Sequence, residues 1–112
     1  MQIEVLKSKI HRAKVTDANL EYAGSITIDE DWIIKAGLYE FEKVHVLNIN
    51  NGERFETYVI KGEKFSQKII LNGAAARKVQ TGDLVIIMAY THIDSEEFDQ
   101  FEPRILLAED YY

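Results

Sequence analysis

The sequence predicts a small, mainly β protein built as a closed or partly closed barrel. Its 112 residues are about the length of one domain, and 46% hydrophobic with 29% charged residues is an ordinary globular composition. Several short segments have the alternating or β-branched pattern of strands. Strands and helices do not alternate regularly, so short strands should close on one another. We expect residues 1–112 to form a single domain.

The first sixty residues contain five segments with strand patterns. The first two alternate apolar with polar residues, and the next two are rich in β-branched residues. The fifth follows Asn51-Gly52, a strong hairpin signal, which predicts a hairpin over residues 44–60. The expected strands are residues 2–7, 9–16, 25–28, 43–49 and 54–60.

The second half contains one long apolar run and one shorter strand candidate. Residues 83–90, DLVIIMAY, follow Thr81-Gly82 and are continuously apolar after the first residue, as expected for a strand buried on both faces. Residues 104–108, RILLA, are the shorter candidate. A helical turn is expected at residues 94–100, within an acidic run that should be solvated.

One short helix is expected between Asp29 and Gly37. Asp29 is a suitable N-cap, and Glu30 and Asp31 lie where the helix dipole is positive. Gly37 is a natural C-terminal stop. Trp32 should pack this helix against the barrel.

The charge balance disfavours nucleic-acid and membrane-surface partners. The formal net charge is −6, which repels phosphate backbones and anionic lipids. Residues 1–24 have a net charge of +1 and residues 25–112 a net charge of −7, so positive charge is relatively concentrated in the N-terminal segment. The chain has no cysteine, no signal-peptide pattern and no apolar run of about 20 residues. We expect a soluble cytoplasmic protein.

No common metal or nucleotide motif occurs in the chain. The phosphate-binding glycine motifs and HExxH are missing, and His11, His45 and His92 have no ligand-like spacing, so no metal site is expected. His45 and His92 are interpreted as structural. For His11, a place in the site and a structural hydrogen bond are equally favoured.

Four local clusters are ordinary when taken singly. They are Lys9-Ile10-His11-Arg12, Gly24-Ser25, Arg54 with Thr57-Tyr58, and Asn72-Gly73-Ala74-Ala75-Ala76. In this order and spacing they closely resemble the pyruvoyl-dependent aspartate 1-decarboxylases, from Lys9 to about Tyr90. One departure is Leu47, where some members of that family have Trp near the site.

The resemblance implies a double-psi β-barrel with one or two short helices and a self-cleaving proenzyme. Cleavage at Gly24-Ser25 would give a β chain of residues 1–24 and an α chain of residues 25–112. Ser25 would become a covalent pyruvoyl group, the cofactor. That group would form a Schiff base with L-aspartate and release CO₂, giving β-alanine for pantothenate biosynthesis.

The resemblance also assigns roles to individual residues. Thr57 would hydrogen-bond the Gly24 carbonyl during cleavage, and Asn72 would place the groups around the pyruvoyl oxygen. Tyr58 would be the proton donor. The residues implied to bind or border the substrate are Lys9, Tyr22, Arg54 and Thr57, with the backbone amides of Gly73, Ala74 and Ala75.

A regular strand at residues 53–60 does not let all of these residues line one pocket. Arg54 and Tyr58 would share a face about 13 Å apart, and Thr57 would face away from Tyr58. Either a bulge interrupts the strand or the site is assembled from more than one subunit. The family's tetrameric barrels favour the second possibility, a homotetramer of cleaved chains. A maturation factor is a further candidate partner.

A second function is compatible with the same fold. The chain would then be a non-catalytic double-psi barrel that serves as a binding or regulatory module. Such a module would be expected to have lost Ser25, Arg54 or Tyr58, and all three are present.

Overall fold

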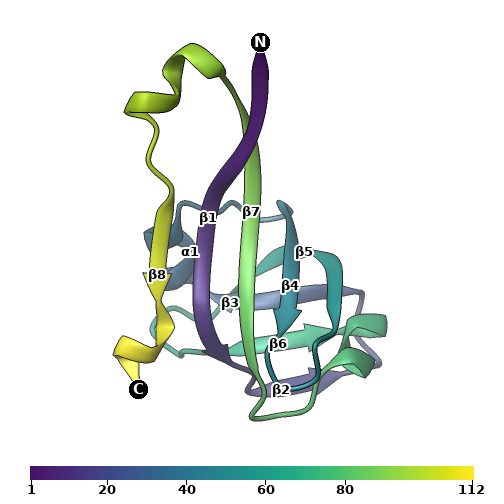
Figure 1. The fold of residues 1–112 in the computed structure, drawn as a ribbon. Coiled ribbons are helices and arrows are strands. Elements are labelled where there is room, and N and C mark those ends of the chain that lie inside the picture. The colour runs from purple at the N-terminus through teal and green to yellow at the C-terminus, as the bar shows by residue number, and fades with distance from the viewer.

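The computed structural model describes all residues from 1 to 112, and its architecture is mainly β (Figure 1). Eight strands form one sheet in the order β2-β6-β3-β5-β4-β7-β1-β8. The strands are β1 Gln2–Lys14, β2 Asp17–Asn19, β3 Ser25–Asp29, β4 Lys43–Asn48, β5 Arg54–Gly62, β6 Ile69–Asn72, β7 Leu84–Asp94 and β8 Arg104–Leu107.

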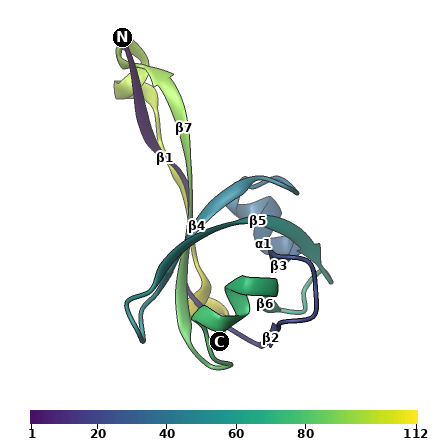
Figure 2. The same cartoon turned by 90° about the vertical axis from the view of Figure 1, so that its right-hand side faces the viewer.

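The sheet curls on itself because β1 leads directly into β2 (Figure 2). β1 pairs with β7 and β8, whereas β2 pairs with β6 at the opposite end of the strand order. Between β1 and β2, the Val15 amide donates to the Asp83 carbonyl and the Thr16 amide to the Ile69 carbonyl, both at 2.8 Å. The parallel pairs β1–β8, β2–β6 and β3–β5 join strands that are distant in sequence. This topology confirms the predicted mainly β double-psi barrel.

The predicted hairpin is confirmed. β4 and β5 pair antiparallel from Lys43 opposite Tyr58 to Leu47 opposite Arg54. On the other side of β4, β7 pairs antiparallel from His45 opposite Met88 onward. The register therefore places β5, β4, β7 and β1 side by side as one continuous surface.

The hydrophobic core lies inside the barrel and is made mostly of β-branched residues. In β7, Val85, Ile87 and Ala89 are buried, while the residues between them are only partly covered. The prediction that this run is buried on both faces is therefore wrong for the single chain. One face of β7 packs in the core, and the other lies on the partly exposed outer surface of the sheet.

The predicted helix is confirmed as α1, Glu30–Ala36. Asp29 caps it by accepting a hydrogen bond from the Asp31 amide, and Gly37 ends it in the left-handed region at φ 69°. Trp32 is buried against the barrel, as expected.

Three 3₁₀ helices complete the structure. The expected turn at residues 94–100 is η2, Ser95–Gln100, and most of that acidic run is exposed. It lies beside the N-terminus where β1 and β7 extend beyond the barrel (Figures 1 and 2). η1, Gly73–Lys78, and η3, Ala108–Tyr111, were not anticipated from the sequence, and neither was the short strand β6.

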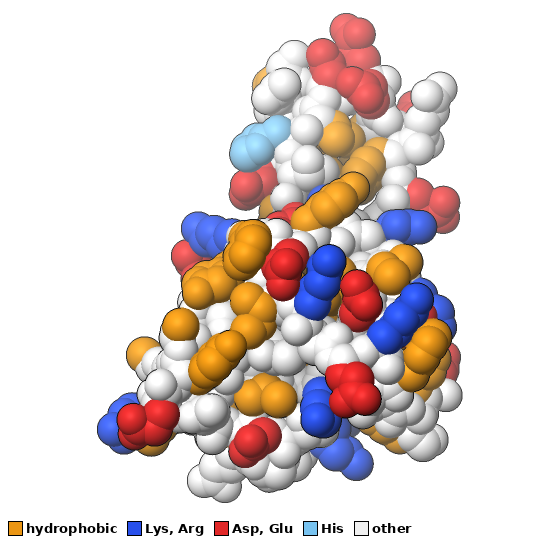
Figure 3. Space-filling view, turned by 180° about the vertical axis from the view of Figure 1, so that it is seen from behind, with side chains coloured by type: hydrophobic (Ala, Val, Ile, Leu, Met, Phe, Trp, Pro, Cys, Tyr) orange, Lys and Arg blue, Asp and Glu red, His pale blue; other side chains and the backbone are white.

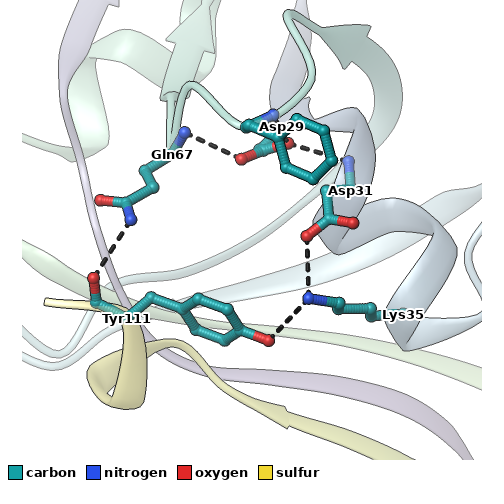
Figure 4. Close-up of polar contacts among 6 residues, drawn as sticks. Asp29, Asp31, Lys35, Gln67 and Tyr111 are labelled. Atoms are coloured by element: carbon teal, nitrogen blue, oxygen red, sulfur yellow. Dashed lines mark hydrogen bonds and ion pairs between the residues drawn. The ribbon is translucent and has the colours of Figure 1, made fainter.

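The Asp29 carboxylate also holds the loop that precedes β6 (Figure 4). It accepts hydrogen bonds from the amides of Phe65, at 2.9 Å, and Gln67, at 2.8 Å. Both loop residues have positive φ. The Gln67 side chain then donates to the Tyr111 carbonyl, so the buried carboxylate links helix, loop and C-terminal segment.

The surface seen from behind is mixed in character (Figure 3). Basic and acidic side chains are interleaved there, with small groups of hydrophobic side chains between them. None of the helices has the length and apolar character that crossing a membrane requires.

Asp29→Ala should lower the free energy of unfolding by about 3 kcal/mol, because it removes a helix cap and leaves two further amides without their acceptor. Urea denaturation measures the loss. Asp94→Ala is the matched control, since Asp94 caps only η2 through one hydrogen bond, from the Glu96 amide, and should cost about 1 kcal/mol or less. Similar losses in both variants would contradict the linking role of Asp29.

Candidate active site

Ser25 is held in a buried polar cluster where β3 begins. It lies opposite Asn72, the last residue of β6, and both side chains are almost completely buried. The Asn72 side-chain amide donates to Ser25 Oγ at 3.0 Å, and Ser25 Oγ donates to the Ala23 carbonyl at 2.9 Å. A donor aimed at Oγ stabilises negative charge that develops on the oxygen, and an acceptor orients its proton. The cluster is therefore suited to a hydroxyl that acts as a nucleophile.

Thr27 is a member of this cluster that the sequence analysis missed. The Asn72 side-chain nitrogen also donates to Thr27 Oγ1, at 3.0 Å. Because the Ser25 hydroxyl donates its proton to the Ala23 carbonyl, it can only accept from Asn72, so the nitrogen end of the Asn72 amide faces both hydroxyls. Ser25 and Thr27 are two residues apart on a strand and so share a face, but their common partner could be identified only with β6 in place.

Gly73 packs directly against the backbone of Gly24. Its φ is 66°, and a Cβ added to it would lie 2.7 Å from the Gly24 Cα and 3.1 Å from the Tyr22 carbonyl oxygen. No larger residue fits there without displacing the segment that precedes Ser25. Gly24 itself is exposed, has space around it for a Cβ, and is not among the glycines with positive φ. Of these two glycines, only Gly73 lies where a larger side chain would not fit.

A shallow pocket of about 240 Å³ lies beside Gly24. It is lined by Thr57 from β5 and by Ala74 and Ala75 from η1. The structure thus brings Gly24 and Thr57 to one pocket with two of the three residues expected to offer backbone amides. The remaining lining residues are Phe55, Glu56 and Lys78.

Arg54 and Tyr58 lie on the opposite face of β5 from Thr57. The pairing of β5 with β4 runs without a shift from Arg54 to Tyr58, so side chains alternate regularly between the two faces. The possibility that a bulge turns all three residues into one pocket is therefore wrong.

Lys9 lies on the same face as Arg54 and Tyr58. Across the sheet, Lys9 pairs with Met88, Met88 with His45, and His45 with Glu56. Residues paired in this way point to the same side. Glu56 in turn shares its face with Arg54 and Tyr58, two residues away on either side. The candidate residues thus form two groups, one around Gly24 and one on the outer face of the sheet.

Arg54 lines a second pocket, also of about 240 Å³, on the outer face. Leu47 forms part of its wall, so the residue at this position contributes to the surroundings of Arg54. Neither Arg54 nor Lys9 has a carboxylate partner, although six lysines of the chain do. Both cations are free to bind an anionic ligand.

Comparison with known proteins gives a consistent result over the whole chain. The family model described as aspartate decarboxylase matches residues 1–111. This chain belongs to the aspartate decarboxylase family. The aspartate 1-decarboxylase of Caldicellulosiruptor bescii is 67% identical over 110 residues, covering 98% of this chain and 86% of that protein. That of Phocaeicola vulgatus is 60% identical over 109 residues, covering 97% of this chain and 94% of that protein.

A further relative and one solved structure complete the comparison. The aspartate 1-decarboxylase of Campylobacter hominis is 62% identical over 106 residues, covering 95% of this chain and 91% of that protein. Among solved structures, the computationally designed protein msDPBB_sym2 is similar, with a TM-score of 0.47 and 17% identity. The match covers 77% of this chain and 98% of the designed one.

In this member of the aspartate decarboxylase family, each histidine lies near a carboxylate. His11 Nδ1 is 3.0 Å from Glu109, beside the C-terminal segment, and His45 Nε2 is 3.0 Å from Glu56. His92 lies 3.7 Å from a glutamate. No three His, Asp or Glu side chains are grouped closely enough to hold a metal ion.

Tyr58 and Tyr22 occupy partly open positions. Tyr58 is 37% exposed and its ring packs against Phe41, with ring centroids 6.4 Å apart. Tyr22 is 56% exposed, in the turn that leads to Gly24. Phe41 is also largely exposed, so an aromatic surface adjoins the face that carries Arg54.

Gly73→Ala should lower the free energy of unfolding by roughly 3 kcal/mol, since strain from positive φ adds to overlap with Gly24. Gly52→Ala is a matched control, because Gly52 has φ 77° and open space around it. It should cost only about 1 kcal/mol. Chemical denaturation of both variants measures the difference, and equal losses would show that the contact with Gly24 has no energetic consequence.

Proposed function

We propose that this chain is the proenzyme of a pyruvoyl-dependent aspartate 1-decarboxylase, a carboxy-lyase that converts L-aspartate to β-alanine and CO₂. The names of its relatives support the reaction. The observation that carries the proposal for this chain is the buried Ser25 hydroxyl, held between the Asn72 amide and the Ala23 carbonyl next to an exposed Gly24.

Self-cleavage would use that hydroxyl as a nucleophile. Ser25 Oγ attacks the Gly24 carbonyl carbon, the peptide C–N bond breaks, and an ester joins the two residues. Elimination across the Cα–Cβ bond of Ser25 then releases the Gly24 carboxylate. Addition of one water and loss of one ammonia convert the remaining dehydroalanine to a pyruvoyl group.

The residues around Ser25 suit this reaction. The Asn72 amide, already within hydrogen-bond distance of Oγ, stabilises the charge that develops there. Thr57 lines the pocket beside Gly24, and in this proposal its hydroxyl donates to the carbonyl under attack. Gly73 packs closely against the backbone of residues 22–24, the segment that precedes Ser25.

Once formed, the pyruvoyl ketone supplies an electrophile for the substrate amine and a sink for the electrons that CO₂ leaves behind. This chain's own residues bind and orient the substrate. Arg54 grips one carboxylate through paired hydrogen bonds, and Lys9 attracts the other. Tyr58 delivers a proton to the carbon that loses CO₂. The amides of Gly73, Ala74 and Ala75, with Tyr22, border the site.

The two groups of site residues lie on opposite faces of β5, which favours a complete site formed between two subunits. Thr57 lies on one face of β5, and Arg54 and Tyr58 lie on the other. A small substrate therefore meets both groups most simply when a second copy supplies one of them. We propose a homotetramer of cleaved chains on this ground, supported by the exposed aromatic surface of Phe41 and Tyr58. The cytoplasmic location and the role in pantothenate biosynthesis stay predictions.

Ser25→Ala should abolish both self-cleavage and CO₂ release from aspartate, because it removes the nucleophile and the precursor of the cofactor. Intact mass spectrometry after warm incubation should show the unmodified chain of 12.9 kDa converting to two fragments, and the variant remaining whole. Ser66→Ala removes a hydroxyl that bonds only within an exposed loop and should behave as the unmodified chain does.

Two outcomes would contradict the proposal. Decarboxylation by Ser25→Ala would exclude a pyruvoyl group derived from Ser25. An unmodified chain that is fully cut and binds aspartate without releasing CO₂ would instead favour the binding or regulatory module.

A further inference from the structure

Arg54 remains unpaired even though acidic side chains flank it. Glu53 precedes it, and Glu56 follows two residues later on the same face of β5, about 7 Å along the strand. Glu56 and Arg54 also line the same pocket. At this spacing a glutamate and an arginine can form an ion pair, yet no such pair occurs here.

Both glutamates are bound to other cations. Lys43 Nζ lies 3.0 Å from one carboxylate oxygen of Glu56, and His45 Nε2 lies 3.0 Å from the other. Glu53 pairs with Lys78 at 3.2 Å. The contacts of Glu56 come from β4, whose register places His45 directly opposite it. Each oxygen of the Glu56 carboxylate therefore has a cationic or hydrogen-bonding partner other than Arg54.

The contacts with Lys43 and His45 favour the ionised form of the Glu56 carboxylate. Its hydrogen bonds to Lys43 and then to His45 lower its pKa below the usual range. The face that carries Arg54 thus contains a permanent negative charge at neutral pH. If that charge moved toward Arg54, it would occupy the guanidinium that an incoming carboxylate requires.

We propose that Lys43 and His45 are positioning residues that hold Glu56 away from Arg54 and so keep Arg54 free for a carboxylate of the substrate. This inference rests on the proposed function, in which Arg54 binds aspartate. Glu56 carries the same chemical group as the substrate and is attached two residues from Arg54. A released Glu56 would compete as a tethered ligand at high effective concentration.

The test uses the cleaved, full-length protein and the double variant Lys43→Met with His45→Phe. Phenylalanine preserves the ring that packs edge-on against Tyr90, while both contacts to Glu56 are lost. We expect the KM for aspartate to rise about two- to fivefold, the range of an exposed ion pair, with kcat unchanged. Adding Glu56→Gln to the double variant should restore KM.

Three further variants separate this effect from a general loss of positive charge or of folding. Lys68→Met removes a lysine that lies 4.0 Å from Glu63 in the loop before β6, and it should leave KM unchanged. Lys43→Met alone changes an exposed side chain that the fold does not need, and it should give part of the rise in KM. Lys43→Arg should retain the parent KM.

A readout independent of turnover is the binding of succinate, a dicarboxylate without an amine. Calorimetry should show its Kd rising by the same factor as KM in the double variant. A crystal structure of that variant should place Glu56 within about 4 Å of the Arg54 guanidinium. An unchanged Kd, a KM that Glu56→Gln fails to restore, or a Glu56 that stays away from Arg54 would overturn the inference. Failure of the unmodified protein to release CO₂ would count against the proposed function instead.

Discussion

The alternation of side chains along β5 is the constraint on which the rest of the site depends. The strand pairs with β4 without interruption from Arg54 to Tyr58, so its successive side chains point to opposite sides of the sheet. Thr57 therefore joins the pocket at Gly24, and Arg54 and Tyr58 join the outer surface. One strand thus presents a different face to each of the two groups of candidate residues.

The neighbours of β5 complete these two groups. β3 pairs with it on one side and begins with Ser25, while β4 on the other side carries Lys43 and His45. On the far side of β3, β6 ends at Asn72, opposite Ser25. Strand order thus determines that the Ser25 hydroxyl has an amide donor beside it and that Glu56 has Lys43 and His45 beside it. The first relation joins residues that are far apart in sequence, whereas the second lies within the β4–β5 hairpin.

This dependence explains how much the sequence could predict. The hairpin and α1 follow from local signals, Asn51-Gly52 for one and Asp29 with Gly37 for the other, and both are confirmed. β6 has only four residues, and its pairing with β2 and β3 requires closure of the whole barrel. Thr27 was missed for that reason, since its link to Ser25 passes through a residue of β6.

The error for β7 has a related cause. A continuous apolar run does not distinguish a strand covered on both faces within one chain from a strand with one partly open face. Leu84, Ile86 and Met88 lie on the less covered side. Met88 lies in the row between Lys9 and His45, so the apolar surface is part of the same outer face as the candidate substrate residues.

The distribution of ion pairs shows how an acidic chain can still offer cations to an anionic ligand. With a net charge of −6, carboxylates outnumber basic side chains, and a free arginine is a strong bidentate partner for any of them. Every ion pair within the chain nevertheless uses lysine or histidine, and Arg54 stays free. If Arg54 binds the substrate as proposed, pairing the internal carboxylates with lysine and histidine leaves the stronger bidentate partner available for that ligand. Exposed ion pairs contribute little to stability. In this interpretation, the contacts of Lys43 and His45 favour substrate binding because they prevent Glu56 from pairing with Arg54.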